Sequence, residues 1–260
     1  MFTAQLLATY EAYSAATWVV VFLTLVAAGV IKGTIGFGLP LSAISVLSNV
    51  IDLHLALAMM TLPILTSSLS IGLEGGQFFA TIRKFWLVVV ALGAGIFIGS
   101  WFLTGIDGRV LMLLVGVTII LFTLAEQWNS GQGFTIPQSH MQPVGMAAGV
   151  VGGLMGGLST AYGPLLVLYL TALRLPKEVH IATIGVILFF GSIFLVLAFS
   201  SVRILTLHTA AISTLAVFPV FIGLGLGRRI RGRVNQVLFR RMTLVALLIL
   251  ALNLLRRALF

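Results

Sequence analysis

Long, nearly continuous apolar runs dominate the sequence and restrict its fold more than any other feature. The runs are about twenty residues long, the length that an α-helix needs to cross about 30 Å of hydrocarbon. Strands of a membrane β-barrel are shorter, about ten residues, and alternate apolar with polar side chains. Hydrophobic residues make up 60% of the chain and charged residues 8%, whereas soluble domains hold about 45–50% and about 25%. We therefore expect an all-α integral membrane protein that crosses the membrane several times.

Two related glycine-rich stretches interrupt the apolar runs, about 120 residues apart. The first is GVIKGTIGFGLP at positions 29–40, and the second is GVVGGLMGGLSTAYGP at positions 149–164. Glycine costs about 1 kcal/mol inside a helix and proline about 3 kcal/mol, so each stretch predicts a broken helix. Broken helices at matching places in two halves are typical of binding sites in duplicated transporters.

The segment order supports an internal duplication. Each half reads as one long, one short and three long apolar segments, which gives about eight to ten transmembrane segments in two five-segment repeats. The first half spans 1–125 and holds segments at about 17–36, 41–50, 55–71, 85–104 and 111–125. A linker at 126–143 follows. The second half spans 144–260 and holds segments at about 144–158, 164–173, 179–199, 204–225 and 242–255.

The basic residues between the segments predict the orientation of the repeats. If each long-short pair is a hairpin, each half crosses the membrane an odd number of times, and the second repeat is inverted. If the pair is instead one kinked helix, the two halves are parallel, and we use the loop charges to test the first possibility. Ten basic residues then lie on one side and four on the other: Arg83, Lys84, Arg174, Lys177, Arg228, Arg229, Arg231, Arg233, Arg240 and Arg241 against Arg109, Arg203, Arg256 and Arg257. Cytoplasmic loops are rich in Lys and Arg, so the first group is expected in the cytoplasm and both termini outside. We expect 228–233 to form a basic loop that contacts lipid, and Glu74 to be solvated.

The two breaks are the best candidates for a binding site. A broken helix in a membrane leaves backbone groups unpaired, so it persists only inside protein or beside a polar cavity. Short helices that begin after the breaks, near positions 41 and 165, would point their positive ends at an anion. The predicted substrate-binding residues are Lys32, Gly33, Thr34, Gly36, Phe37, Gly38, Pro40, Gly156, Gly157, Ser159, Thr160, Tyr162, Gly163 and Pro164. The alternative is that the glycines only allow close helix packing, which we expect for the pairs at 29 and 33 and at 149 and 153.

Lys32 is the one basic residue well inside an apolar segment. A lysine buried in the membrane is a functional candidate, as a partner for an anion or as the carrier of a coupling proton. The alternative is that its side chain reaches the interface near the helix end. The second half has Gly152 at the corresponding position.

Other kinds of site find little support. The chain has no cysteine, and its histidines lack the spacing of a metal site. No strand precedes the glycine-rich stretches, and the GxxxxGK[ST] nucleotide motif is absent. We therefore expect no catalytic residues, no metal, no cofactor and no nucleic-acid partner.

The residues at the two breaks resemble those of the sulfite exporter TauE/SafE family, also described as the toluene-sulfonate uptake permease family. The resemblance rests on positions 33–40, on their counterpart at 153–164 and on the turn Leu175-Pro176-Lys177-Glu178. It covers nearly the whole chain as architecture. It implies a multi-pass carrier in a bacterial-type inner membrane, which moves sulfite, sulfonates or related small organic anions.

Residues and resemblance together predict a secondary transporter of a small anion, working by alternating access of two inverted repeats. Its partners would be the anionic substrate, membrane lipid and, where export is driven, a coupling proton; a homodimer is left open. Two alternatives remain, a passive anion channel and a non-transporting accessory membrane protein. The sequence leaves open the substrate, the direction of transport and the coupling ion.

Overall fold

The described part of the chain is helical. The computed structural model describes residues 13–103 apart from 75 and 77, residues 136–233 apart from 174 and 176, and scattered positions within 105–124 and 245–256. Its helices are α2 (Ala15–Ile35), α3 (Leu39–Leu47), α4 (Leu53–Glu74), α5 (Phe78–Leu103), α7 (Met141–Ser159), α8 (Gly163–Ala172), α9 (Lys177–Ser201) and α10 (Leu207–Arg231). A short 3-10 turn, Gln138–His140, precedes α7. No strand occurs among the described residues.

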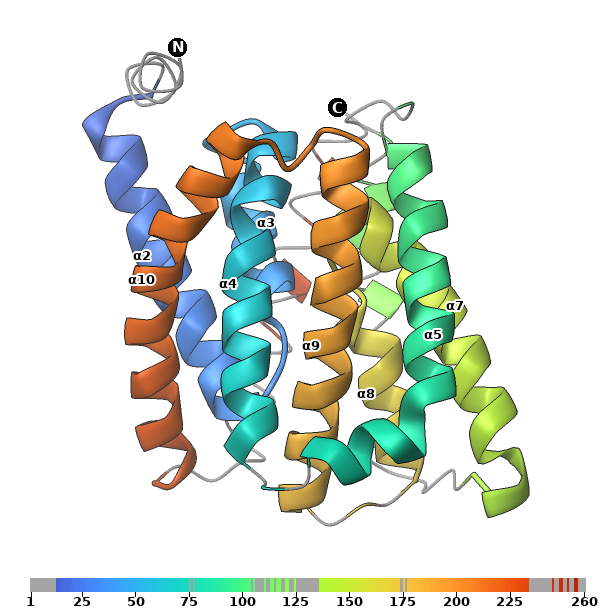
Figure 1. Ribbon diagram of the computed structural model, residues 1–260. Helices are drawn as coiled ribbons and strands as arrows, with labels where there is room; N and C mark the ends of the chain where they lie inside the picture. Colours follow the sequence, from blue (N-terminus) through green and yellow to red (C-terminus); the bar gives the residue numbers. More distant parts are fainter. Residues whose placement is uncertain are drawn as a thin grey trace.

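Six of these helices, α2, α4, α5, α7, α9 and α10, are long and apolar enough to cross a membrane. The remaining two, α3 and α8, have 9 and 10 residues. At about 1.5 Å per residue they are too short to span about 30 Å of hydrocarbon. The chain is therefore a multi-pass membrane protein with two short helices packed among its spans (Figure 1).

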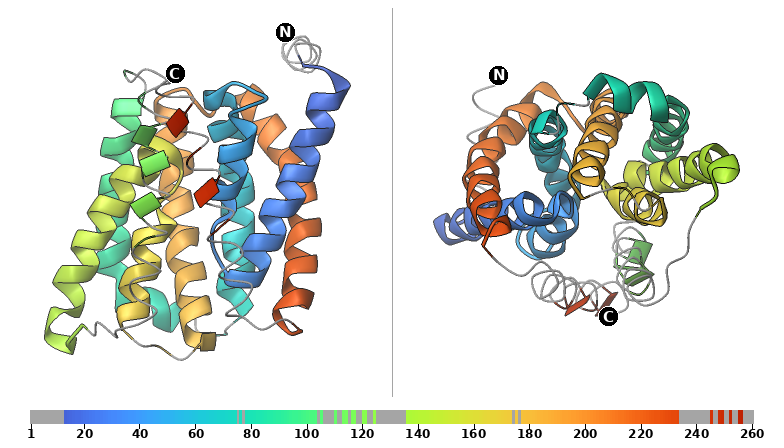
Figure 2. Two further views of the ribbon diagram at one scale, coloured as in Figure 1. Left: turned by 180° about the vertical axis from the view of Figure 1, so that it is seen from behind. Right: turned by 90° about the horizontal axis from the view of Figure 1, so that it is seen from below.

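The long helices form two groups that meet at α4 and α9. One group contains α2, α4 and α10, and the other contains α5, α7 and α9, as the view along the bundle shows (Figure 2). The short helix α3 packs against α2 and α4, and α8 packs against α7 and α9. In Figure 1, α2 descends from the N-terminal end of the chain, whereas α7 begins at the lower end and ascends.

Glycines allow the closest helix pairs to form. A Cβ at Gly33 would lie 2.5 Å from the Leu224 carbonyl oxygen of α10, and a Cβ at Gly149 would lie 2.8 Å from the Val88 carbonyl oxygen of α5. At Gly29 and Gly153 a Cβ would likewise collide with a carbonyl oxygen of the facing helix. Small residues are common where membrane helices approach this closely. The prediction that these two pairs of glycines serve packing is confirmed.

Several helix ends differ from the sequence prediction. Helix α10 continues to Arg231 before Gly232 caps it, so the expected basic loop at 228–233 is largely helical. Helix α5 begins at Phe78, seven residues early, and changes direction at Phe85, whose backbone is non-helical (φ −111°, ψ 16°). Helix α7 begins at Met141, because Pro143 lies in its first turn, where a missing N–H costs little. The expected segments at 111–125 and 242–255 and most of the linker lie outside the described residues.

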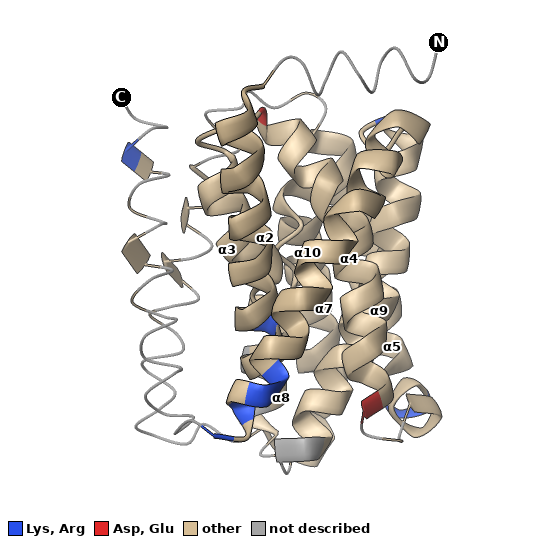
Figure 3. Ribbon diagram, turned by 90° about the vertical axis from the view of Figure 1, so that its left-hand side faces the viewer, with Lys and Arg blue, Asp and Glu red and all other residues tan. Residues whose placement is uncertain are grey.

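The described charged residues gather at the two ends of the bundle. Basic residues are concentrated at the lower end, around the end of α10 (Figure 3). The spans carry few charges between their ends, as the apolar membrane interior requires. Lys32 is the exception, because it lies inside α2 and is only 1% exposed.

Candidate functional site

The first break separates α2 from α3 at Gly36, Phe37 and Gly38. Gly36 (φ 89°) and Gly38 (φ 90°) both have left-handed backbone conformations, which glycine adopts without steric cost. The Gly36 N–H donates to the Lys32 carbonyl over 2.7 Å and closes the last turn of α2. Gly38 then precedes α3 without a side-chain cap, and Pro40 lies in the first turn. The first amides of α3 therefore lack intrahelical partners.

The second break separates α7 from α8 at residues 160–162. Thr160 takes a left-handed conformation (φ 61°), and its N–H donates to the Gly156 carbonyl over 2.6 Å. Helix α8 begins directly afterwards at Gly163 and Pro164. Proline is favoured in a first helical turn, because its fixed φ suits the helix and its missing N–H would be unpaired there. Both breaks thus end in a short helix with proline at its start.

The two breaks face a common cavity of about 20 Å³. Such a volume holds about one water molecule. The lining residues come from both halves of the chain and surround the starts of both short helices. They are Lys32, Phe37, Gly38, Pro40, Leu41 and Ile64 from the first half, and Thr160, Tyr162, Gly163, Pro164 and Leu188 from the second. The two breaks, more than 120 residues apart in the sequence, therefore contribute to one site.

Lys32 places an amine at this cavity. Its Nζ donates to the Ser68 hydroxyl over 2.8 Å and, more weakly, to the Ile64 carbonyl over 3.4 Å. Among the described residues, no carboxylate forms a salt bridge with it. The alternative in which Lys32 reaches the interface is wrong, because the side chain is directed inward to α4 instead. An amine that is held inside a membrane protein without a carboxylate partner is suited to an anionic ligand.

Hydroxyl groups near the breaks are already engaged with backbone carbonyls. Tyr162 donates to Leu188 over 3.0 Å and Thr160 to Ser159 over 2.6 Å. Thr34 donates to Val30 over 2.7 Å and to Gly227 of α10 over 3.2 Å. Offering these hydrogens to a ligand would require the hydroxyls to leave their acceptors. In the described conformation, the amine of Lys32 and the amides that begin α3 and α8 are the better donors.

Eight of the predicted site residues line the cavity, and six do not. Those outside are Gly33, Thr34, Gly36, Gly156, Gly157 and Ser159. Gly33 and Thr34 face α10, and Gly157 faces α5. Gly156 lies against the Tyr162 ring, so it shapes the second break from behind. Gly36 faces Ile181 and Ile184. The helical turn explains this split, since neighbouring residues of α2 or α7 point to different sides of the helix.

The prediction from sequence missed Leu41, Ile64 and Leu188 in the lining and Ser68 behind it. The apolar members carry no signal, since leucine and isoleucine fill every segment. Ser68 belongs to a hydroxyl-rich run at 66–70 near the end of an otherwise apolar segment. That run was the signal that could have pointed to a partner for Lys32.

An arginine from α10 completes the broken end of α2. Arg231 donates through Nε to the Gly33 carbonyl over 3.0 Å, and its Nη1 lies 3.0 Å from Glu74 Oε2. Arg228 Nη2 is 2.5 Å from Glu74 Oε1 and also donates to the Ser70 hydroxyl over 2.8 Å. A guanidinium is favoured at the carbonyl end of a helix. Glu74 is exposed, as expected for a solvated residue, but it also joins two arginines and ties α4 to α10 beside α2.

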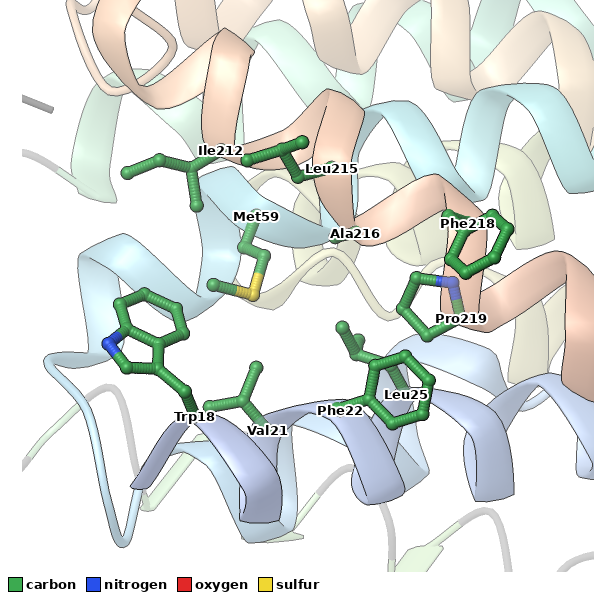
Figure 4. A pocket seen from close by; sticks show the side chains of 10 residues that line it. All are labelled: Trp18, Val21, Phe22, Leu25, Met59, Ile212, Leu215, Ala216, Phe218 and Pro219. Atoms are coloured by element: carbon green, nitrogen blue, oxygen red, sulfur yellow. The ribbon is translucent and has the colours of Figure 1, made fainter. Parts of the chain in front are cut away.

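A larger apolar cavity of about 250 Å³ lies between α2, α4 and α10 (Figure 4). Its walls include Phe22, Leu215 and Phe218, whose exposed fractions are 41%, 68% and 68%. In a membrane-spanning bundle, apolar side chains exposed to this degree face lipid. The cavity offers no charged group and so does not suit an anion. No cluster of three or more His, Cys, Asp or Glu that could hold a metal occurs in the described part of the chain.

Comparison with models of protein families identifies the family of the chain. The model of the sulfite exporter TauE/SafE family matches residues 21–254, which include both breaks and every residue that lines the small cavity. The chain belongs to the sulfite exporter TauE/SafE family. Members of the TauE/SafE family are membrane transporters rather than enzymes. No curated protein and no solved structure matches the chain.

Proposed function

We propose that this TauE/SafE protein is a secondary transporter of a small anion, with sulfite, sulfonates or related organosulfur and carboxylate anions as its substrates. The observation that carries the proposal is the convergence of two helix breaks and one buried amine on a single cavity. The amine of Lys32 supplies positive charge, and the starts of α3 and α8 supply amides at the positive ends of helix dipoles. Gly38 and Gly163 let the anion approach the backbone.

The helix packing supports two inverted repeats. The contacts of α2 with α10 and α3 correspond to those of α7 with α5 and α8, and the contact of α4 with α10 corresponds to that of α9 with α5. The contact between α4 and α9 is unchanged when the two halves are exchanged, because each of these helices takes the place of the other. Because α2 and α7 run in opposite directions (Figure 1), a two-fold axis in the membrane plane relates the halves in this proposal.

The small size of the cavity supports alternating access. A volume of about 20 Å³ is too small for sulfite or a sulfonate, since it holds about one water molecule. The cavity would therefore have to widen when it takes up the anion. In the proposed cycle, the groups containing α2 and α7 rock against each other at the contact between α4 and α9, and the cavity opens first to one side and then to the other.

A thermal-shift screen of the purified protein tests the binding step. The ligands are sulfite, sulfate, thiosulfate, sulfoacetate, taurine and small carboxylates. A true substrate stabilises the folded state by about 2.7 kcal/mol when its concentration is 100 times Kd, so the midpoint should rise with concentration. The Lys32→Met variant keeps a long apolar chain and should lose this rise. An unchanged midpoint with every anion would refute the proposed site.

Flux measurements separate a carrier from a channel. In proteoliposomes, a carrier shows saturable uptake that is stimulated by substrate on the opposite side, because the loaded site returns faster than the empty one. A channel shows no such stimulation. We expect stimulated uptake for the wild type and none for Lys32→Met. Flux without saturation would favour the channel, and no flux despite anion binding would favour an accessory protein.

A further inference from the structure

The buried hydroxyl of Tyr162 is held in a way that matches the amine of Lys32. Tyr162 is 1% exposed and extends from the second break to α9, where its hydroxyl donates to the Leu188 carbonyl over 3.0 Å. Ser192, one turn further along α9, donates its own hydroxyl to the Phe189 carbonyl over 2.6 Å. The ring packs between Gly156 and Gly191, where an added Cβ would in each case lie 2.8 Å from a ring atom. The side chain therefore has one well-defined position at the cavity.

Lys32 is held at the corresponding carbonyl of α4. It donates to the Ile64 carbonyl and also to the Ser68 hydroxyl, whereas Tyr162 donates its one hydrogen to the Leu188 carbonyl. In both helices a serine follows that carbonyl by four residues. Residues four apart lie on the same helical face, one turn above the other. Both serines are fully buried, with exposed fractions of 0%.

The two arrangements occupy corresponding places in the fold. Helices α4 and α9 pack against each other, and the pairs Ile64/Leu188 and Ser68/Ser192 are each separated by 124 positions. The glycine-rich stretches are offset by 120, and the second contains about four additional residues before its short helix. An offset of 120 positions plus about four inserted residues gives the offset of 124 for residues that follow the break. Each repeat thus presents one long polar side chain to the shared cavity, from a different position of its own chain.

We propose that Ser68 is a positioning residue of the anion site, which holds the amine of Lys32 against the cavity. This inference rests on the proposed function. A flexible lysine loses conformational freedom when an anion binds, and a fixed hydrogen bond on its amine removes part of that cost in advance. Ser68 would act through Lys32, without contact with the anion, since it does not line the cavity.

Alanine substitutions at the serines test this role against a close control. Ser67 is equally buried but donates to the Pro63 and Ile64 carbonyls of its own helix. We expect Ser68→Ala to raise the KM for anion uptake about tenfold, the scale of one hydrogen bond to a charged group. The maximal rate should stay within about twofold, because translocation does not use the serine. Ser67→Ala should leave both quantities near the wild-type values.

The second half supplies a further control. Ser192→Ala should leave KM near the wild-type value, because the Ser192 hydroxyl donates to its own helix. A Ser68→Ala effect as small as that of Ser67→Ala or Ser192→Ala would overturn the positioning role while anion binding by the wild type persists. If the wild type binds no anion, the proposed function fails first, and this inference fails with it.

Discussion

A glycine near these breaks allows either close helix packing or access to the cavity, and Gly163 allows access to the cavity. Its backbone is not left-handed, and a Cβ there would meet only the Leu188 side chain, at 3.7 Å. Gly157, six residues earlier, packs against α5, where a Cβ would lie 2.5 Å from the Ser100 nitrogen. The two glycines lie in similar sequence but have different roles. Gly157 allows the close approach of two helices, and Gly163 allows access to the site.

Gly163→Ala and Gly157→Ala should distinguish an effect on anion binding from an effect on stability. We expect the Gly163→Ala variant to fold with a nearly unchanged unfolding midpoint, and to bind anion about tenfold more weakly, since an added methyl group in a filled site costs about 1–3 kcal/mol. Gly157→Ala should show the reverse pattern, with a loss of stability of similar size. Thermal unfolding with and without anion measures both quantities. Equal loss of stability in the two variants would contradict this division.

The ends of α2, α4 and α10 are joined by the cluster of Glu74, Arg228 and Arg231. The side chain of Arg231 is 17% exposed, and those of Arg228 and Glu74 are 34% and 33% exposed, so the cluster lies between a surface pair and a buried one. Surface pairs contribute about 0–1 kcal/mol, whereas breaking a buried pair costs about 3–5 kcal/mol. Since α10 also caps α2 beside Lys32, the cluster connects the site to the end of the bundle.

Glu74→Gln should lower the free energy of unfolding by about 1–2 kcal/mol, between those two limits. The loss should shrink at high salt, which screens partly exposed charges. Asp52→Asn is the matched control, because Asp52 is 62% exposed, lies 3.9 Å from His54 and accepts the Leu55 N–H at the start of α4. Asparagine serves that capping role equally well, so its effect should be small. Thermal unfolding of both variants at two salt concentrations gives the comparison.

For the whole molecule, the sequence predicted what depends on local pattern. Apolar length predicted the six long helices of the described part of the chain, and glycine with proline predicted both breaks to within a few residues. Side-chain direction could not be predicted, because it depends on which helix lies opposite. Gly33 and Thr34 therefore face α10 although they flank the break. The Arg231 contact with Gly33 also joins residues 198 positions apart, and only the assembled bundle reveals it.

The orientation of the molecule in the membrane follows from its charge distribution. Arg83, Lys84 and the arginines at 228–233 lie at the end of the bundle where α5 begins and α10 ends, and Arg203 lies in the connection between α9 and α10 at the other end. Lys and Arg are enriched in cytoplasmic loops, so the first end should be cytoplasmic. Because the natural chain has no cysteine, single cysteines can report on each end without further changes.

Gly232→Cys and Ser201→Cys mark the two ends at exposed positions while keeping every charge. A Cβ at Gly232 would come no closer than 3.8 Å to the Arg229 carbonyl oxygen, so the substitution should be tolerated. A maleimide that cannot cross the membrane should label Ser201→Cys in intact cells and Gly232→Cys only after the membrane is opened. The reverse pattern would invert the topology, and labelling of both variants in intact cells would contradict the placement of these ends on opposite sides.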